Sequence, residues 1–305
     1  MANATVPTDA SRPQAGFNWG RLFTALLLAL IIFVTLFPFW WVIRTGLTSS
    51  RLVFTDTSSL LPVGATLDNF IRVLGLVDTE TAVAAGGSGQ SINFFLFLRN
   101  SIIVSTIIAV GQVFFSSSAA YAFARLKFPF RDQLFFLYIS ALMVPAIVTL
   151  IPNFILMRQL EWLNTFAGVV APYLLMTPFA VFFLRQFYLG INREIEEAAK
   201  IDGANIFAVY WRVILPISRP PLITLGIITF IQSWNEYLWP LIVGKEEGVR
   251  VLTVALGIFR SQTPQGAPDW SGLMAGTTLA IIPTLILFFV LGRRVLDSIQ
   301  FTGFK

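Results

Sequence analysis

The chain contains no cysteine and no histidine, and only 12% of its 305 residues are charged. The two missing residue types remove thiol nucleophiles, disulfides, imidazole acid–base chemistry and the usual zinc sites. A soluble domain carries about 25% charged residues, so a water-soluble fold of this size could not cover its surface with so few charges. Because the thiol and imidazole groups are missing, we expect that the protein is not an enzyme and has no catalytic site.

Long apolar segments take the place of the missing charges. Apolar residues make up 56% of the chain, and the mean hydropathy is +0.75. A membrane-spanning helix needs about 20 consecutive apolar residues, and six such runs are present, at 22–43, 101–123, 134–155, 166–184, 222–243 and 273–291. The predicted fold class is all-α, a polytopic membrane protein with six transmembrane helices over residues 21–305, preceded by a polar N-terminal tail over residues 1–20.

Prolines and small residues within the runs predict how the helices bend and pack. Prolines lie inside or near them at positions 38, 145, 152, 172, 178 and 283, where a membrane bundle tolerates kinks. Small and hydroxyl residues at Ser105, Gly111 and 116–119 permit close contacts between helices. Packing explains these small residues better than ligand binding does.

Basic residues between the runs indicate the orientation. The net charge is +5, but no basic cluster of a nucleic-acid-binding module is present, so nucleic acid is not an expected partner. An internal N-terminus puts most of the basic residues into short cytoplasmic segments, at 12, 21, 125, 127, 131, 185, 193, 200, 212, 219, 293, 294 and 305. Both termini are therefore predicted to be cytoplasmic. The longer segments 45–99 and 244–272 are then external.

Residues 192–217, between the fourth and fifth runs, predict two short helices, and we call this segment the hairpin. Glutamates at 194, 196 and 197 suit the positive N-terminal end of the first helix. Glu196 and Lys200 are four residues apart and are expected to pair across one helical turn. On this pattern alone, a surface hairpin resting on lipid headgroups is an equally good interpretation.

A bend separates the two predicted helices. Gly203 is placed to end the first helix in a left-handed conformation. Asn205 can then cap a second helix over residues 206–215, which Pro216 is expected to end.

The residue order within the hairpin is more specific than its helical pattern. The order is Glu197-Ala198-Ala199, three residues, Gly203, nine residues, Val213, one residue and Leu215-Pro216. This order resembles the EAA loop of ABC-importer permeases, EAA-x3-G-x9-I-x-LP. Val213 replaces an isoleucine. Asn192 stands where carbohydrate-type members usually have proline.

Further segments extend the resemblance over nearly the whole chain. They are Leu67-Asp68-Asn69-Phe70, Asn100-Ser101, 120–125, Leu163-Asn164-Thr165 and 234–241. Together with the hairpin they resemble the smaller permease of the carbohydrate-uptake, maltose-type subfamily. The resemblance implies the ABC-importer permease fold and a place in the cytoplasmic (inner) membrane of a prokaryote.

The resemblance implies that the hairpin docks as a coupling helix on a cytoplasmic ATPase subunit. The expected contacts are Glu197 as polar anchor, Ala198 and Ala199 as a close-approach face, Asp202 as a second polar contact or cap and Gly203 as the bend, with Ala204 and Pro216 in the same loop. The chain contains no phosphate-binding GxxxxGK[ST] segment. We therefore expect no cofactor in this chain, with ATP and magnesium held by the ATPase partner.

The partners implied by the resemblance are a second, related permease forming a heterodimer, two ATPase subunits, an external solute-binding protein and membrane lipid. The expected cargo is a carbohydrate, with a di- or oligosaccharide favoured. One alternative is an ABC permease for a non-sugar solute such as a glycerol phosphodiester. Another is an ion-coupled secondary carrier, but such carriers usually show several buried carboxylates and an internal repeat, and the sequence offers one candidate carboxylate and no evident repeat.

That carboxylate is Glu236, about two-thirds along the fifth run. An ionisable residue at membrane depth should face a water-filled path or a polar partner. One interpretation is that Trp234, Asn235, Glu236 and Tyr237 line the substrate path, with rings against sugar faces and polar groups on hydroxyls. The other is that Glu236 pairs with a basic residue of this subunit or its partner and fixes helix packing. The sequence leaves both open.

Overall fold

The computed structural model describes residues 19–260 and 266–300, with the backbone alone from residue 293 onward. Within these ranges the chain forms helices and no strands, so the predicted all-α class is confirmed. Three helices are long and apolar enough to cross a membrane by themselves, α1 (Trp19–Leu47), α4 (Phe94–Arg125) and α15 (Trp270–Gln300), and the number of candidate spans rises to the expected six if each of three bent helix pairs is one span. Residues 1–18 of the predicted tail and 301–305 lie outside the described ranges.

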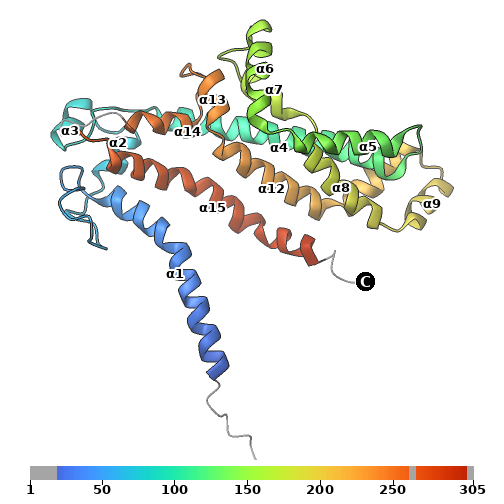
Figure 1. Cartoon of the computed structure of the whole chain (residues 1–305), viewed down its shortest axis with the longest axis horizontal. Coiled ribbons are helices and arrows are strands. Elements are labelled where there is room, and N and C mark those ends of the chain that lie inside the picture. The colour runs from blue at the N-terminus through green and yellow to red at the C-terminus, as the bar shows by residue number, and fades with distance from the viewer. Residues whose placement is uncertain (1–18, 261–265, 301–305) are drawn as a thin grey trace, which may run out of the picture.

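The centre of the bundle is α4. It packs against α8 (Pro178–Gly190) on one side and α12 (Arg219–Asn235) on the other, and α12 also packs against α15. Figure 1 shows these helices running side by side. The C-terminal end of α1 meets the first part of α15, and the N-terminal part of α1 stands away from the bundle. None of the most apolar window of α1 is buried.

Prolines mark the bends within the paired spans. The bend is 97° between α5 (Arg131–Ser140) with η1 (Ala141–Met143) and α6 (Ala146–Gln159), and 44° between α7 (Phe166–Leu174) and α8. Pro145 precedes α6 and Pro178 opens α8. A proline lacks the N–H that would continue a helix but fits the first turn of a new one. The third run, 134–155, is therefore no single straight helix, and α6 stands away from α5 (Figure 1).

The fifth run, 222–243, also differs from the expected continuous span. The α12 helix ends at Asn235, and α13 (Leu238–Val243) begins after a break at Glu236 and Tyr237. Pro240 explains this break, because it has no N–H to donate to the carbonyl of Glu236 four residues earlier. That carbonyl instead accepts the hydroxyl of Thr253 at 3.0 Å. Glu236 therefore lies between two helices and not within one.

The segments predicted to be external fold together into a cap. It comprises α2 (Asp68–Val73), α3 (Thr79–Ala84), α14 (Leu252–Ala255) and η3 (Leu256–Arg260). Arg72 and Asp269 form a buried ion pair within it, with side-chain exposures of 4% and 1%. Asp269 also accepts the backbone N–H groups of Ser88 and Gly272, each at 2.9 Å. Two segments far apart in the sequence are thus joined by one carboxylate.

Candidate functional site

The hairpin forms as the sequence predicts, at the end of the bundle opposite the cap (Figure 1). Its first helix is α9 (Arg193–Ile201), and Asn192 caps it by accepting the N–H of Glu194 at 3.1 Å. Gly203 has a φ of +89°, the left-handed conformation expected at the bend. Asn205 accepts the N–H of Ala208 at 2.8 Å and so caps the second helix.

The second helix of the hairpin has three parts. It begins with α10 (Ile206–Val209), passes through a π-helical turn, η2 (Tyr210–Ile214), and ends with α11 (Leu215–Ile217). Pro216 lies in the first turn of α11, so the helix ends at Ile217 and not before Pro216. The bend of 76° between this helix and α12 follows at Ser218.

One side of the hairpin is exposed and mixes polar and apolar groups. Glu197, Ala198 and Asp202 are exposed, and between them the Ile201 side chain is 87% exposed. Phe207 is 76% exposed after the bend. Such apolar groups outside a core are typical of a surface that another protein or the membrane covers.

The other predicted contacts of the hairpin lie in different places. Ala199 and Ala204 are half-buried and pack against the core of the bundle, so Ala198 is the alanine that faces outward. Gly203 is exposed, and a Cβ added there would meet no other atom within 4 Å. Pro216 is exposed at the far end of the hairpin.

Glu196 turns inward and does not make the expected pair with Lys200. Its Oε1 lies 2.8 Å from Nε of Arg125, the last residue of α4, and the two side chains are 6% and 4% exposed. The Arg125 guanidinium also donates to the carbonyls of Tyr188 at 2.6 Å and Ile191 at 2.5 Å. The buried partner from another helix replaces the surface pair that spacing alone predicts, because a pair on an exposed helix face is worth only a few tenths of a kcal/mol.

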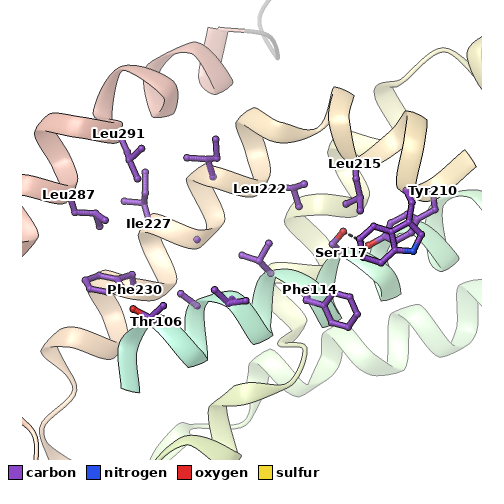
Figure 2. Close-up of a pocket in the computed structure, with 16 residues that line it drawn as sticks. Thr106, Phe114, Ser117, Tyr210, Leu215, Leu222, Ile227, Phe230, Leu287 and Leu291 are labelled. Atoms are coloured by element: carbon purple, nitrogen blue, oxygen red, sulfur yellow. Dashed lines mark hydrogen bonds between the residues drawn. The ribbon is translucent and has the colours of Figure 1, made fainter. Parts of the chain in front are cut away.

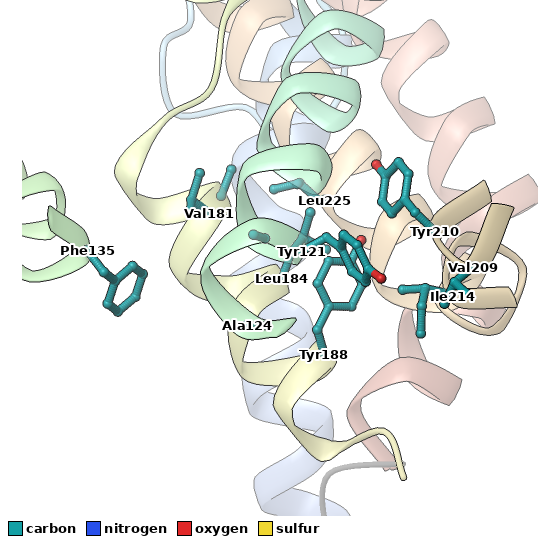
Figure 3. Packing of buried hydrophobic residues seen from close by; sticks show 12 residues of the cluster. Tyr121, Ala124, Phe135, Val181, Leu184, Tyr188, Val209, Tyr210, Ile214 and Leu225 are labelled. Atoms are coloured by element: carbon teal, nitrogen blue, oxygen red, sulfur yellow. The ribbon is translucent and has the colours of Figure 1, made fainter. Parts of the chain in front are cut away.

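A group of tyrosines joins the hairpin to the bundle at Ser117, before Arg125 on α4. The Ser117 hydroxyl lies 2.8 Å from the Tyr188 hydroxyl and 2.7 Å from that of Tyr210. Figure 3 shows Tyr121, Tyr188 and Tyr210 converging between α4, α8 and the hairpin, surrounded by apolar side chains such as Ile214. The rings of Tyr121 and Tyr210 are 5.0 Å apart.

The break at Glu236 borders a polar pocket of about 370 Å³. It is lined by Val104, Ile108, Gln112, Val169, Tyr173, Thr229, Gln232, Ser233, Asn235, Glu236, Trp239 and Pro240. Amide, hydroxyl and carboxyl groups here lie beside the rings of Tyr173 and Trp239. The polar groups can bond hydroxyls and the half-buried Tyr173 ring can contact a ligand, whereas Trp239 is 2% exposed and packs within the pocket wall.

Glu236 has a structural task at this pocket. Its Oε1 accepts the N–H of Trp239 at 3.2 Å and so caps α13. Among the residues that the structure describes, no lysine or arginine lies within ion-pair distance of Glu236. The expected charge pairing within this subunit is therefore not found there.

The four residues predicted to line one path divide between two pockets. Trp234 is 4% exposed, stacks on Phe230 and donates to the carbonyl of Ala280 at 3.2 Å, so it belongs to the contact of α12 with α15. Tyr237 lines a second pocket of about 550 Å³ together with Trp234 and Asn235. Of these four residues, Asn235 borders both pockets. Glu236 lines the polar pocket, and Trp234 and Tyr237 line the second one.

Gln112 is a lining residue that the sequence analysis missed. Its side chain donates to the carbonyl of Tyr173 at 2.9 Å and accepts the hydroxyl of Thr229 at 3.3 Å. It thereby connects α4, α7 and α12 beside the pocket. An amide inside an otherwise apolar run is the signal that could have found it, because polar residues at membrane depth face a cavity or a partner.

A third hollow is apolar. It lies between α4, α12, α15 and the hairpin, has a volume of about 540 Å³ and is shown in Figure 2. Leu222, Ile227, Phe230, Leu287 and Leu291 contribute to its walls. Its lining offers almost no polar partner, so it does not suit a polar cargo.

Within the part of the chain that the structure describes, no cluster of three or more acidic side chains that could hold a metal ion is found.

The chain resembles known transport proteins over most of its length. It is 32% identical to the arabinooligosaccharides transport system permease protein AraQ of Halalkalibacterium halodurans, over 91% of this chain and 94% of that protein. It is also 32% identical to the sn-glycerol-3-phosphate transport system permease protein UgpE of Salmonella typhi, over 89% of this chain and 93% of that protein.

The fold has a counterpart among solved structures. A chain of a bacterial ABC transporter involved in the import of the acidic polysaccharide alginate superimposes with a TM-score of 0.75, at 23% identity, covering 92% of this chain and 99% of that one. Residues 112–300, which include the hairpin and the break at Glu236, match the family described as the binding-protein-dependent transport system inner membrane component. The chain belongs to this family of membrane-embedded transport permeases.

Proposed function

We propose that this chain is a permease subunit of an ABC importer that carries a carbohydrate, with a di- or oligosaccharide as the favoured cargo. Its family membership and its resemblance to a permease named for arabinooligosaccharides support this proposal. The exposed face of the hairpin is the observation that carries it. An ion-coupled secondary carrier would have no use for such a face, and the family argues against that alternative.

In the proposed mechanism, the exposed hairpin face binds a cytoplasmic ATPase subunit. Glu197 and Asp202 supply polar contacts, Ala198 permits close approach, and Ile201 and Phe207 supply apolar area that is exposed in the isolated chain. A rigid helical element of this kind can convert movement of the ATPase into movement of the spanning helices. ATP and magnesium are bound by the ATPase, and this chain performs no hydrolysis.

The proposed assembly contains a second, related permease, two ATPase subunits and an external solute-binding protein. The cap is the surface available to the binding protein, and the hairpin is the surface available to the ATPase. This arrangement requires the hairpin and both termini to be cytoplasmic, as the distribution of basic residues indicates.

The polar pocket beside Glu236 is the proposed substrate path of this subunit. Gln112, Gln232 and Asn235 offer amides, and the half-buried Tyr173 offers a ring. These groups suit a sugar, because hydroxyls need several bonding partners once they leave water. The 32% identity to a glycerol-3-phosphate permease supports one other cargo class, a non-sugar solute such as a glycerol phosphodiester.

Site-specific thiol chemistry tests the orientation and the docking, since the chain has no cysteine of its own. Ala198→Cys should react with a membrane-impermeant maleimide in inside-out vesicles stripped of the ATPase and not in intact cells. A bifunctional cross-linker at the same position should capture an ATPase subunit, whereas Val110→Cys on the exposed side of α4 should capture none. Labelling of Ala198→Cys in intact cells would overturn the proposed function.

A transport assay with two radiolabelled probes tests the cargo class. The purified complex in proteoliposomes should import an arabino-oligosaccharide and not sn-glycerol 3-phosphate. Gln232→Ala removes an exposed pocket amide and should raise the KM for uptake, while Gln186→Ala removes an exposed amide of α8 away from the pocket and serves as the control. Import of the phosphate probe alone would instead assign the non-sugar class.

A further inference from the structure

We propose that Arg125 and Tyr210 are positioning residues that fix the hairpin to α4 and α8 at two separate points, so that the three elements move as one body. The importance of this clamp for transport rests on the proposed docking of the hairpin to an ATPase. Its existence rests only on the contacts within this chain.

The first point of attachment is at the end of α4. Arg125 forms its ion pair with Glu196 of α9, and the same guanidinium donates to the carbonyls of Tyr188 and Ile191 at the end of α8. The last carbonyls of a helix have no partner within the helix. One side chain therefore satisfies the end of α8 and holds the first helix of the hairpin.

The second point of attachment lies about two turns back along α4. Ser117 bonds both the Tyr188 hydroxyl of α8 and the Tyr210 hydroxyl of the hairpin, and the Ser118 hydroxyl lies 3.2 Å from that of Tyr210. The same three elements meet here as at Arg125. Tyr210 is 6% exposed and opens the π-helical turn, a feature that occurs frequently at functional sites.

Two attachments restrict the hairpin more than one could. Ser117 and Arg125 are separated by about 12 Å along the axis of α4. A single contact would allow the hairpin to pivot about it, whereas contacts at both ends of this interval fix its tilt. The first point holds the first helix of the hairpin and the second holds the second helix, so the bend at Gly203 is held from both sides.

A distance measurement between two spin labels tests the clamp in the full complex. Lys200→Cys places one label on the hairpin and Ile102→Cys places the other on α4, and both positions are exposed. The two sites should be on the order of 35 Å apart, from the rise of α4 between Ile102 and Arg125. We expect one narrow distance distribution, unchanged when ATP and vanadate are added.

Removing either attachment should release the hairpin. Glu196→Gln and Tyr210→Phe should each broaden the distribution, and ATP with vanadate should then shift its mean, because the hairpin follows the ATPase without the bundle. The matched controls are Glu194→Gln, an exposed carboxylate of the same helix, and Tyr121→Phe, a tyrosine of the same cluster outside the Ser117 hydrogen bonds. Both controls should retain the narrow, nucleotide-independent distance.

The outcomes separate the clamp from the docking role. If the variants broaden the distribution but nucleotide shifts none of them, the clamp stands and the docking of the hairpin is refuted. Distributions of Glu196→Gln and Tyr210→Phe that match the controls in complexes of normal elution volume would overturn the clamp. Tyr210→Phe keeps the ring and its packing, so this variant remains informative if Glu196→Gln fails to fold.

Discussion

Arg125 at the end of α4 and Glu196 in the hairpin form a buried ion pair, with 2.8 Å between Nε and Oε1. Removal of one partner leaves an uncompensated buried charge, which costs about 3–5 kcal/mol. We therefore expect Arg125→Met to lower the thermal unfolding temperature of the purified protein clearly. The double variant Arg125→Met/Glu196→Met, which leaves no unpaired charge, should recover part of the loss. Equal unfolding temperatures for the single and double variants would contradict this prediction.

The partner of Glu196 could not be predicted from neighbouring residues, whereas other features of the hairpin could. The cap of the second hairpin helix and the left-handed Gly203 depend on residues within a few positions and were predicted correctly, whereas the cap that Asn192 provides for α9 was not predicted. The partner of Glu196 depends on how α4 packs against the hairpin, and no local spacing encodes that. Glu196 pairs with the buried Arg125 and not with the exposed Lys200, and the attraction between opposite charges is stronger where water is excluded.

The pH dependence of the cap should depend on Asp269. Burial alone would raise the pKa of this carboxyl, but its bonds to Arg72 and to the N–H groups of Ser88 and Gly272 prevail, and its pKa is held below the ordinary value of 3.8. A carboxyl whose pKa is lower in the folded than in the unfolded chain stabilises the folded state at any pH above its unfolded pKa. This stabilisation is lost as the pH falls from the unfolded pKa through the lowered, folded pKa.

Thermal unfolding of wild type and Asp269→Asn between pH 7 and pH 3 measures this contribution. The variant should be less stable at pH 7, and the difference between the two proteins should shrink toward pH 3. Asp68→Asn, an exposed carboxylate on α2, should differ little from wild type throughout. A constant difference between wild type and Asp269→Asn across the range would argue against the assigned role of the ion pair.

The conformation of Gly203 gives a prediction within the hairpin itself. No atom lies near enough to obstruct a side chain there, so the cost of Gly203→Ala comes only from its positive φ and should be about 1–2 kcal/mol. Gly190 is equally open but helical, and Gly190→Ala should be neutral or stabilising. Hydrogen exchange should therefore rise around the bend in Gly203→Ala alone.

The helix breaks show which parts of the fold required the structure. Six apolar runs were visible because hydropathy depends on composition alone, and the prolines predicted kinks. The size of each bend was not predictable, since it depends on what the freed carbonyl can bond. At Glu236 the hydroxyl of Thr253 donates to the freed carbonyl and a complete break results. Trp234 and Glu236 line different pockets, and their spacing alone could have predicted this, because residues two apart do not share a face of a helix.

Two glycines of the spanning helices give a matched test of close packing. A Cβ at Gly111 of α4 would lie 2.4 Å from Cδ1 and 2.7 Å from the backbone oxygen of Leu174 in α7. A Cβ at Gly226 of α12 would meet nothing closer than Cγ2 of Val113 at 3.7 Å. Overpacking costs about 1–3 kcal/mol, so Gly111→Ala should destabilise the protein by that amount.

Gly226→Ala should leave the stability unchanged or raise it by up to about 1 kcal/mol, the difference in helix propensity between the two residues. Unfolding of both variants in the same detergent provides the comparison. Because Gln112, the neighbour of Gly111, bonds the carbonyl of Tyr173, a displaced α7 should also disturb the polar pocket. Gly111→Ala should therefore impair uptake while Gly226→Ala does not, and equal uptake by the two variants would show that the pocket does not depend on this contact.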